Sequence, residues 1–141
     1  MKFELLIGRI LFSSIFLISV PQLFTRGSVQ YAASEGVPWA SVLVPIAGVL
    51  ALLGGLSVLL GFKARWGAWL LVLFLVPVSV MMHAFWAVKD PTMAQMQQIH
   101  FMKNMTMLGG ALLVVYFGSG PVSVDAWLGA RRSAAPAKAP A

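Results

Sequence analysis

Cysteine is absent from this 141-residue sequence, and acidic side chains are scarce, with only four aspartate and glutamate residues. The absence of cysteine excludes disulfide bonds, thiolate metal sites, iron–sulfur clusters and redox-active thiols on this chain. Charged residues of either sign make up only 10% of the sequence, whereas a soluble domain carries about 25%. The chain therefore has too little polar surface to coat a water-soluble globule, and most of it must face lipid.

Apolar residues, in contrast, make up 60% of the sequence. They are gathered into four runs, each long enough to cross the hydrocarbon core of a bilayer as an α-helix, which takes about 17 to 25 residues. The predicted spans cover residues 5–24, 40–60, 66–83 and 101–117. This pattern predicts an all-α fold: a transmembrane four-helix bundle with antiparallel up-down topology, in one membrane domain over residues 1–128.

The two ends of the chain need separate predictions. The first run could be a secretory signal peptide because Lys2 precedes it, but Arg9 interrupts its start and no small-residue cleavage site follows Val20. A retained helix is the better prediction, and the connector after it is expected to form a short interfacial helix over residues 28–34. Residues 129–141 are basic and rich in alanine and proline, which predicts a disordered tail.

The ten basic residues give a formal net charge of +6, but they do not indicate nucleic-acid binding. They stand singly at the ends of apolar runs instead of forming a continuous basic stripe. With four spans, the basic residues of both termini and of the turn at residues 63–65 fall on one side of the membrane. The positive-inside rule makes that side cytoplasmic, so both termini are predicted to be cytoplasmic.

Polar residues gather on the opposite side, where the third span ends and the fourth begins. His83 closes the third span and Trp86 follows it, while Lys103 and Asn104 share one face of the fourth helix with His100. Two adjacent antiparallel helices would bring these residues together as a ligand-binding site for a lipid headgroup or a quinone carbonyl. The alternative is that Lys103 anchors the helix at the interface and the histidines are hydrogen-bonded loop residues.

A polar pair is predicted on the side of the termini. Arg9 lies one turn into the first span, and Asp125 follows the last span by a few residues. Because buried charges are normally paired, we expect a structural ion pair between Arg9 and Asp125 that ties the first helix to the last. Glu4 is the competing partner for Arg9.

No other motif in the sequence indicates a reaction. It contains no nucleophile placed beside a base, no phosphate-binding loop and no pair of carboxylates within a span. The two histidines lack the C-x-x-C-H context of haem attachment, and no metal site is predicted. The eight methionines indicate adaptable apolar packing. Enzymatic activity is therefore left undecided by the residues themselves.

Several short motifs together resemble one known family. In chain order they are GRILFSSIFL from Gly8, GGLSVLLGFKARWGA from Gly54, HAFW from His83, and FMKNMTMLGG followed by FGSGPVSVD, which ends at Asp125. In this order and spacing they resemble the DoxX family of small four-helix membrane proteins. The resemblance implies a multi-pass protein of the bacterial inner (plasma) membrane.

The DoxX resemblance also implies a small subunit or accessory of a membrane redox system, in contact with redox-enzyme partner proteins. No resident cofactor is expected on this chain, and quinone is the candidate ligand. One alternative is a non-catalytic membrane scaffold or assembly factor that recruits partners through residues 84–98 or through the tail. The other is a small-solute carrier, which four spans could form only by oligomerising or by enclosing a narrow cavity. A homo-oligomer is compatible with each hypothesis.

Overall fold

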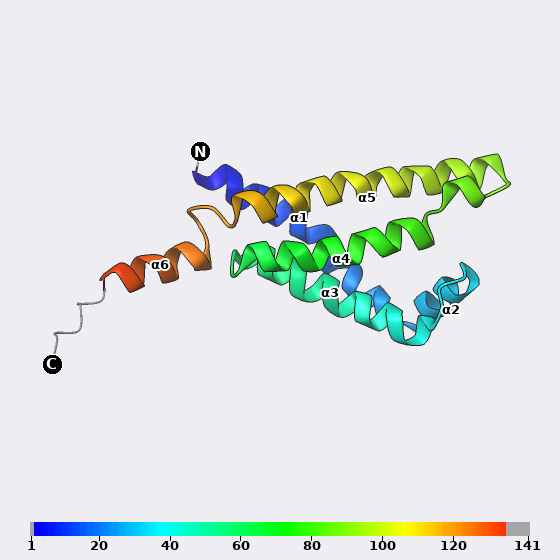
Figure 1. The fold of residues 1–141 in the computed structure, drawn as a ribbon, viewed down its shortest axis with the longest axis horizontal. Helices are drawn as coiled ribbons and strands as arrows, with labels where there is room; N and C mark the ends of the chain where they lie inside the picture. Colours follow the sequence, from blue (N-terminus) through cyan, green and yellow to red (C-terminus); the bar gives the residue numbers. More distant parts are fainter. Residues whose placement is uncertain (1, 135–141) are drawn as a thin grey trace.

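The computed structural model describes residues 2–134, which are helical apart from short connections. The elements are α1 (Lys2–Leu23), α2 (Arg26–Ser34), α3 (Ala40–Leu60), α4 (Ala64–Met82), the 3₁₀ turn η1 (Phe85–Ala87), α5 (Pro91–Phe117) and α6 (Val124–Ala134). The predicted all-α fold is confirmed. The four long helices run alongside one another, and the start of α1 and the whole of α6 lie at the same end of the molecule (Figure 1).

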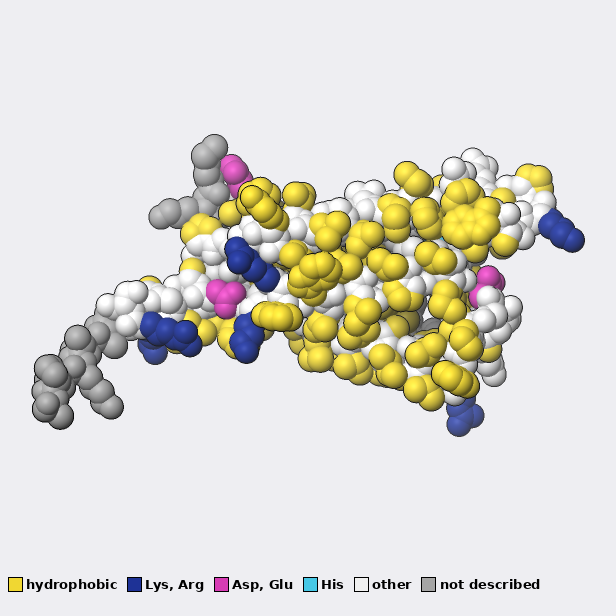
Figure 2. Space-filling model, in the orientation of Figure 1, with side chains coloured by type: hydrophobic (Ala, Val, Ile, Leu, Met, Phe, Trp, Pro, Cys, Tyr) yellow, Lys and Arg dark blue, Asp and Glu magenta, His cyan; other side chains and the backbone are white. Residues whose placement is uncertain are grey.

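Three stretches of helix within residues 2–134 are long and apolar enough to cross a membrane: Phe3–Leu23, Ala40–Leu60 and Ala64–Ala87. The fourth expected span, residues 101–117, lies inside α5 but does not belong to this set, because His100, Lys103 and Asn104 make that part of the helix more polar. Apolar side chains cover the middle of the molecule, and basic side chains lie at its two ends (Figure 2). This distribution is that of a membrane protein.

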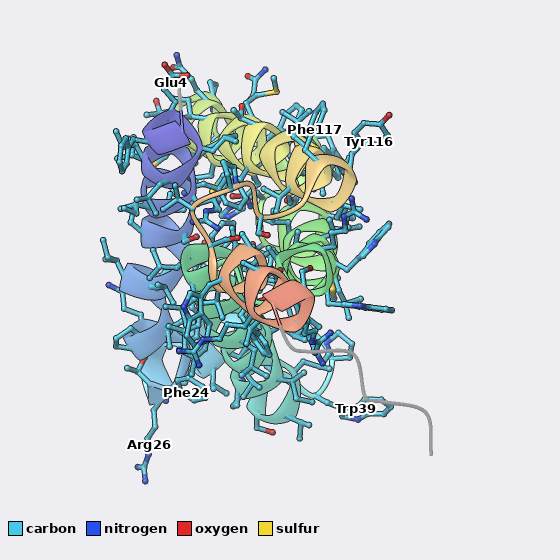
Figure 3. All side chains as sticks on the ribbon, turned by 90° about the vertical axis from the view of Figure 1, so that its left-hand side faces the viewer. Glu4, Phe24, Arg26, Trp39, Tyr116 and Phe117 are labelled. Atoms are coloured by element: carbon cyan, nitrogen blue, oxygen red, sulfur yellow. The ribbon has the colours of Figure 1, made fainter. Side chains whose placement is uncertain are left out.

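The outward-facing side chains of the long helices are largely apolar and aromatic. Viewed along the helices, the labelled side chains of Trp39 and Tyr116 point away from the molecule (Figure 3), and Phe117 is exposed as well. The ring of Phe24, in contrast, lies against Gly48 of α3. In a lipid environment the outward-facing side chains meet hydrocarbon or the headgroup boundary, where aromatic rings are favourable.

The packing of the long helices differs from a closed four-helix bundle. α1 packs against α3, α3 against α4, and α4 against α5, whereas α1 and α5 approach each other less closely. The core between them is built around the buried Phe16, Leu71 and Leu75, and Phe16 meets Phe74 edge-on with 6.2 Å between ring centroids. The predicted four-helix bundle is therefore not clearly formed, because its α1–α5 side remains open.

The helix boundaries follow local capping. α3 coincides with the predicted span 40–60, and α2 begins at Arg26 because the Thr25 side chain accepts the backbone N–H of Ser28. α5 begins ten residues before the predicted span, since Asp90 accepts the N–H of Met93 at 2.8 Å and Pro91 suits the first helical turn.

The C-terminal tail was expected to be disordered from residue 129, but α6 continues to Ala134. The Ser123 hydroxyl accepts the N–H of Ala126 at 3.1 Å and so caps the start of α6. Arg131 lies 4.0 Å from the centre of the Trp127 ring, and its position in the last turn suits the helix dipole. The remainder of the expected tail, residues 135–141, lies outside the described residues.

Candidate functional site

A chain of hydrogen bonds joins three helices at the end of the molecule opposite α6. His83 follows α4, and its Nδ1 lies 2.7 Å from the Oε1 of Gln97 on α5. An amide oxygen only accepts, so this distance assigns the proton to Nδ1 of His83. The Nε2 of Gln97 donates to the hydroxyl of Tyr31 on α2 at 3.3 Å. The chain of bonds therefore runs from α4 through α5 to α2.

His100 lies against this chain of bonds. Its ring stacks on His83, with 5.2 Å between ring centroids. Burial lowers the pKa of His100, and the nearby Lys103 and His83 lower it further. The imidazole of His100 is therefore uncharged at neutral pH.

The other predicted ligand-binding residues lie around this chain of bonds rather than in it. Trp86 is exposed and packs edge-on against Phe101, with 5.7 Å between ring centroids. Lys103 is exposed at the surface of α5, whereas Asn104 is buried. The ligand-binding site of His83, Trp86, Lys103 and Asn104 therefore stays a prediction, and of the four only His83 joins the observed hydrogen bonds.

Two residues of this network, Gln97 and Tyr31, were missed by the sequence analysis. Gln97 precedes His100 by three residues and Asn104 by seven, which is the spacing of one helical face. That spacing was available in the sequence once α5 was extended back to Pro91. Nothing in the sequence pairs Tyr31 with α5.

Acidification is expected to destabilise the folded protein through His100. The pKa of His100 is lower in the folded chain than in the unfolded chain, so the unfolded chain binds more protons once the pH falls below about 6.5. The stability that depends on an uncharged His100 is fully present above about pH 6.5. It is lost as the pH falls from about 6.5 toward the lower pKa of His100 in the folded chain. Thermal unfolding in detergent at pH 7.5 and pH 5.5 measures the loss. His100→Phe keeps a ring against His83 and should reduce the pH dependence; an identical dependence in both proteins would contradict this assignment.

The opposite end of the molecule is organised around Arg9. Its side chain is only 5% exposed. Nη1 donates to the backbone carbonyl of Ser119 at 2.8 Å, and Nη2 donates to that of Val122. Both carbonyls belong to the loop between α5 and α6, so the guanidinium of α1 holds that loop in place.

The predicted ion pair between Arg9 and Asp125 takes a different form. The Oδ1 of Asp125 accepts the backbone N–H of Lys63 at 2.9 Å, and the backbone N–H of Asp125 donates to the carbonyl of Gly61 at 3.0 Å. Asp125 therefore holds the α3–α4 turn, and its charge acts on Arg9 without direct contact. Arg9 therefore ties α1 to the loop before α6 through the carbonyls of Ser119 and Val122, and not through the carboxylate of Asp125.

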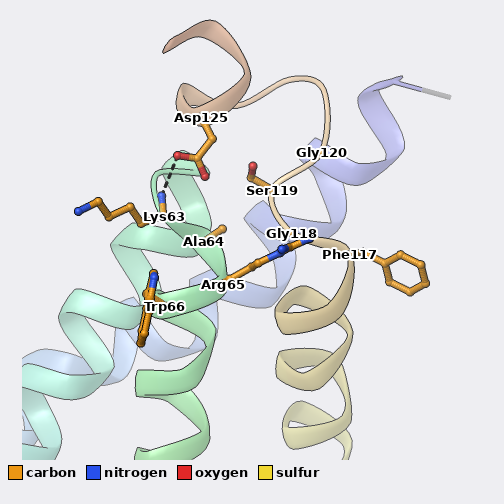
Figure 4. Close-up of a pocket in the computed structure, with 9 residues that line it drawn as sticks. All are labelled: Lys63, Ala64, Arg65, Trp66, Phe117, Gly118, Ser119, Gly120 and Asp125. Atoms are coloured by element: carbon orange, nitrogen blue, oxygen red, sulfur yellow. Dashed lines mark hydrogen bonds between the residues drawn. The ribbon is translucent and has the colours of Figure 1, made fainter. Parts of the chain in front are cut away.

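Two cavities of about 320 Å³ each open at this end, and both are lined by Phe117, Gly118 and Ser119. The first lies at the α3–α4 turn (Figure 4). There Arg65 reaches toward Gly118 and donates to the carbonyl of Tyr116 at 3.2 Å, while the side chain of Lys63 points away. The charged groups that line this cavity, Arg65 and Asp125, therefore already have hydrogen-bond partners within the protein.

The second cavity lies between α1 and α5, along the open side of the helix arrangement. Its lining is mostly apolar, and Arg9 and Glu4 are its only charged residues. The lining consists of Glu4, Leu5, Gly8, Arg9, Phe12, Gly110, Leu113, Val114, Phe117, Gly118 and Ser119.

Comparison with known proteins identifies similar sequences over nearly the whole chain. The model of the SURF4 family matches residues 3–128. The inner membrane protein YphA of Escherichia coli (strain K12) is 32% identical over 123 residues, which cover 86% of this chain and 87% of YphA. The Surfeit locus protein 4 homolog of Schizosaccharomyces pombe is 32% identical over 91 residues, or 64% of this chain and 29% of that protein. No solved structure matches the chain.

These matches overturn the expected DoxX membership, because the family model that matches is that of SURF4. The motifs behind the resemblance are short and consist of glycines, apolar residues and single charges at helix ends. Close helix packing and the membrane interface favour such residues in many membrane proteins. The redox role was implied by that resemblance and loses its basis with it.

Proposed function

Because this chain belongs to the SURF4 family of membrane proteins, we propose that it is a non-catalytic protein that holds a partner protein at the outer end of its helices. The inner-membrane location follows from the likeness to YphA, whose name states it. Within residues 2–134, no group of three or more histidine, cysteine, aspartate or glutamate side chains could hold a metal ion. The exposed apolar side chains at the outer end of α5, among them Met93 and Met96, support a binding role.

The proposal includes α5 as a fourth span over residues 101–117, antiparallel to α4. Lys103 then lies close to the end of the span, where its long side chain can reach the interface. Four spans would place both termini on one side. The basic side chains gathered at that end favour the cytoplasm as this side; they are Arg9, Lys63, Arg65, Arg131 and Arg132.

The observation that carries the proposal is the projection of α5 beyond α4. α4 ends at Met82, and the bond between His83 and Gln97 marks the corresponding level on α5. The turns of α5 from Pro91 to Met96 therefore extend past α4 by about 9 Å, at 1.5 Å per residue. η1 packs beside this projection (Figure 1).

The projecting surface is apolar where a membrane protein would meet water or headgroups. Met93 and Met96 are exposed on the projecting turns, and Trp86 of η1 and Ile99 are exposed beside them. Polar residues such as Gln95 interrupt the same turns, which supports a location outside the hydrocarbon core. Methionine-rich surfaces adapt to the shape of a bound protein, so this surface suits a partner with a complementary apolar segment. Quinone at His83 is the weaker alternative, because Gln97 already engages Nδ1 of that histidine.

We expect the double variant Met93→Gln/Met96→Gln to lose its partner while it keeps its thermal stability, because both side chains are exposed. A photo-crosslinking amino acid at position 93 should give a defined protein adduct in intact membranes. The same protein should co-purify with the wild type in mild detergent and be lost from the double variant. The matched control is Gln95→Ala/Gln98→Ala, in the same turns of α5. Crosslinks to lipid alone, or an unchanged partner with the double variant, would overturn the proposal.

A further inference from the structure

The cavity between α1 and α5 is a lateral groove that opens toward the surrounding lipid. Its walls are apolar over most of their length, with Phe12 and Gly110 at one end and Ser119 at the other. A Cβ on Gly110 would lie 2.8 Å from the Phe12 ring, so the two helices do touch at the closed end. The groove beyond that contact has a volume of about 320 Å³, which is room for part of an acyl chain, and its other end reaches the polar loop between α5 and α6.

The groove carries a buried cation that is only partly compensated. Arg9 lines the groove with its guanidinium bonded to two neutral carbonyls, and no salt bridge to Asp125 forms. Its Nε and the hydroxyl of Ser13, one turn further along α1, are buried and make no hydrogen bond within the described residues. A buried charge whose direct hydrogen bonds all go to neutral groups is costly, so a further negative charge at the mouth of the groove would be stabilising.

The residues around the groove also favour a negatively charged ligand. Four further basic residues lie at the same end of the molecule: Lys63, Arg65, Arg131 and Arg132. The acidic residues at that end are Glu4 and Asp125. Asp125 is bound to the α3–α4 turn, and Glu4 is exposed and engaged in an interaction of its own. The end of the molecule is therefore positive overall and attracts anionic lipid.

We propose that this groove binds one anionic phospholipid of the adjacent leaflet. Its phosphate lies at the mouth near Ser119, where the charge of Arg9 is felt, and one acyl chain lies along Phe12, Leu113 and Val114. The inference is independent of the partner surface at the opposite end of the helices. A zwitterionic lipid such as phosphatidylcholine would fill the apolar walls equally well, but its choline cation would be repelled by the basic side chains at this end, so it would be held less tightly.

The test compares two lipids on the purified full-length chain in detergent. Dioleoyl phosphatidylglycerol or dioleoyl phosphatidylcholine is added, and thermal unfolding is followed by tryptophan fluorescence. We expect phosphatidylglycerol to raise the Tm by about 4 °C or more under conditions where phosphatidylcholine does not, and native mass spectrometry to find one bound phosphatidylglycerol. Equal shifts with both lipids would overturn the proposal.

A glycine in the groove provides a variant that blocks it without disturbing Arg9. Gly8 lines the groove, and a Cβ placed on it meets no atom within 4 Å, so Gly8→Leu should fill the groove and abolish the difference between the lipids. Gly109 on α5 also has open space around its Cβ but does not line the groove. Gly109→Leu is therefore the matched control and should retain the difference. A Gly8→Leu protein that still distinguishes the lipids would place the site elsewhere and overturn the proposal.

Discussion

Arg9→Met is expected to lower the free energy of unfolding by about 3 kcal/mol, because it removes two hydrogen bonds from a charged donor, each worth about 1.5–3 kcal/mol. The carbonyls of Ser119 and Val122, which these bonds satisfy, would lose their partner. Relief of the cost of burying the guanidinium offsets part of the loss. The measurement is thermal unfolding in mild detergent.

The loop between α5 and α6 should respond to the same substitution. Arg9 holds residues 119 and 122 from the side of α1, so its removal should expose the loop to limited proteolysis while the long helices remain protected. Arg26→Met is the control, since Arg26 is an exposed cation at the opposite end of the molecule, and exposed substitutions usually change stability by about 0.5 kcal/mol or less. Equal stability and equal cleavage in the two variants would show that the bonds of Arg9 are not needed to hold the loop.

The partner of Arg9 illustrates what could not be predicted from the sequence. An arginine near the start of a span indicates that a partner must exist, and the nearest sequence candidates were the carboxylates of Glu4 and Asp125. The observed partners are backbone carbonyls, which every residue carries and which no sequence pattern distinguishes. Only the path of the loop decides which carbonyls reach α1.

The helices themselves were more predictable than their ends. Residues 40–60 are apolar and bounded by Pro38-Trp39 and Gly61, so α3 was expected with its observed limits. The predicted span of residues 101–117 followed hydropathy, whereas α5 begins at Pro91 because Asp90-Pro91 caps a helix whose first turns are polar. α6 was missed for the same reason, since the cap at Ser123 precedes a short helix with little apolar character.

A close contact between α3 and α4 at Gly67 leads to the second large expected effect. A Cβ on Gly67 would lie 2.3 Å from the Oγ and 2.4 Å from the Cβ of Ser57, and 3.1 Å from the carbonyl oxygen of Gly54. Ser57 has little freedom to move away, because its hydroxyl donates to the carbonyl of Phe62 at 2.6 Å and so stabilises the α3–α4 turn. The added methyl group must therefore separate the two helices or break that bond.

Gly67→Ala is accordingly expected to destabilise the protein by about 2 to 3 kcal/mol, the cost of inserting a carbon into a closely packed contact. Gly109→Ala is the same substitution in the middle of α5, where a Cβ meets no atom within 4 Å. It should be neutral or stabilising by up to about 1 kcal/mol through helix propensity. Both are measured as shifts in Tm in the same detergent, and the pair isolates packing from propensity. If Gly67→Ala matched Gly109→Ala, the contact between α3 and α4 would have to be looser than its geometry indicates, and the turn that Asp125 binds would not depend on it.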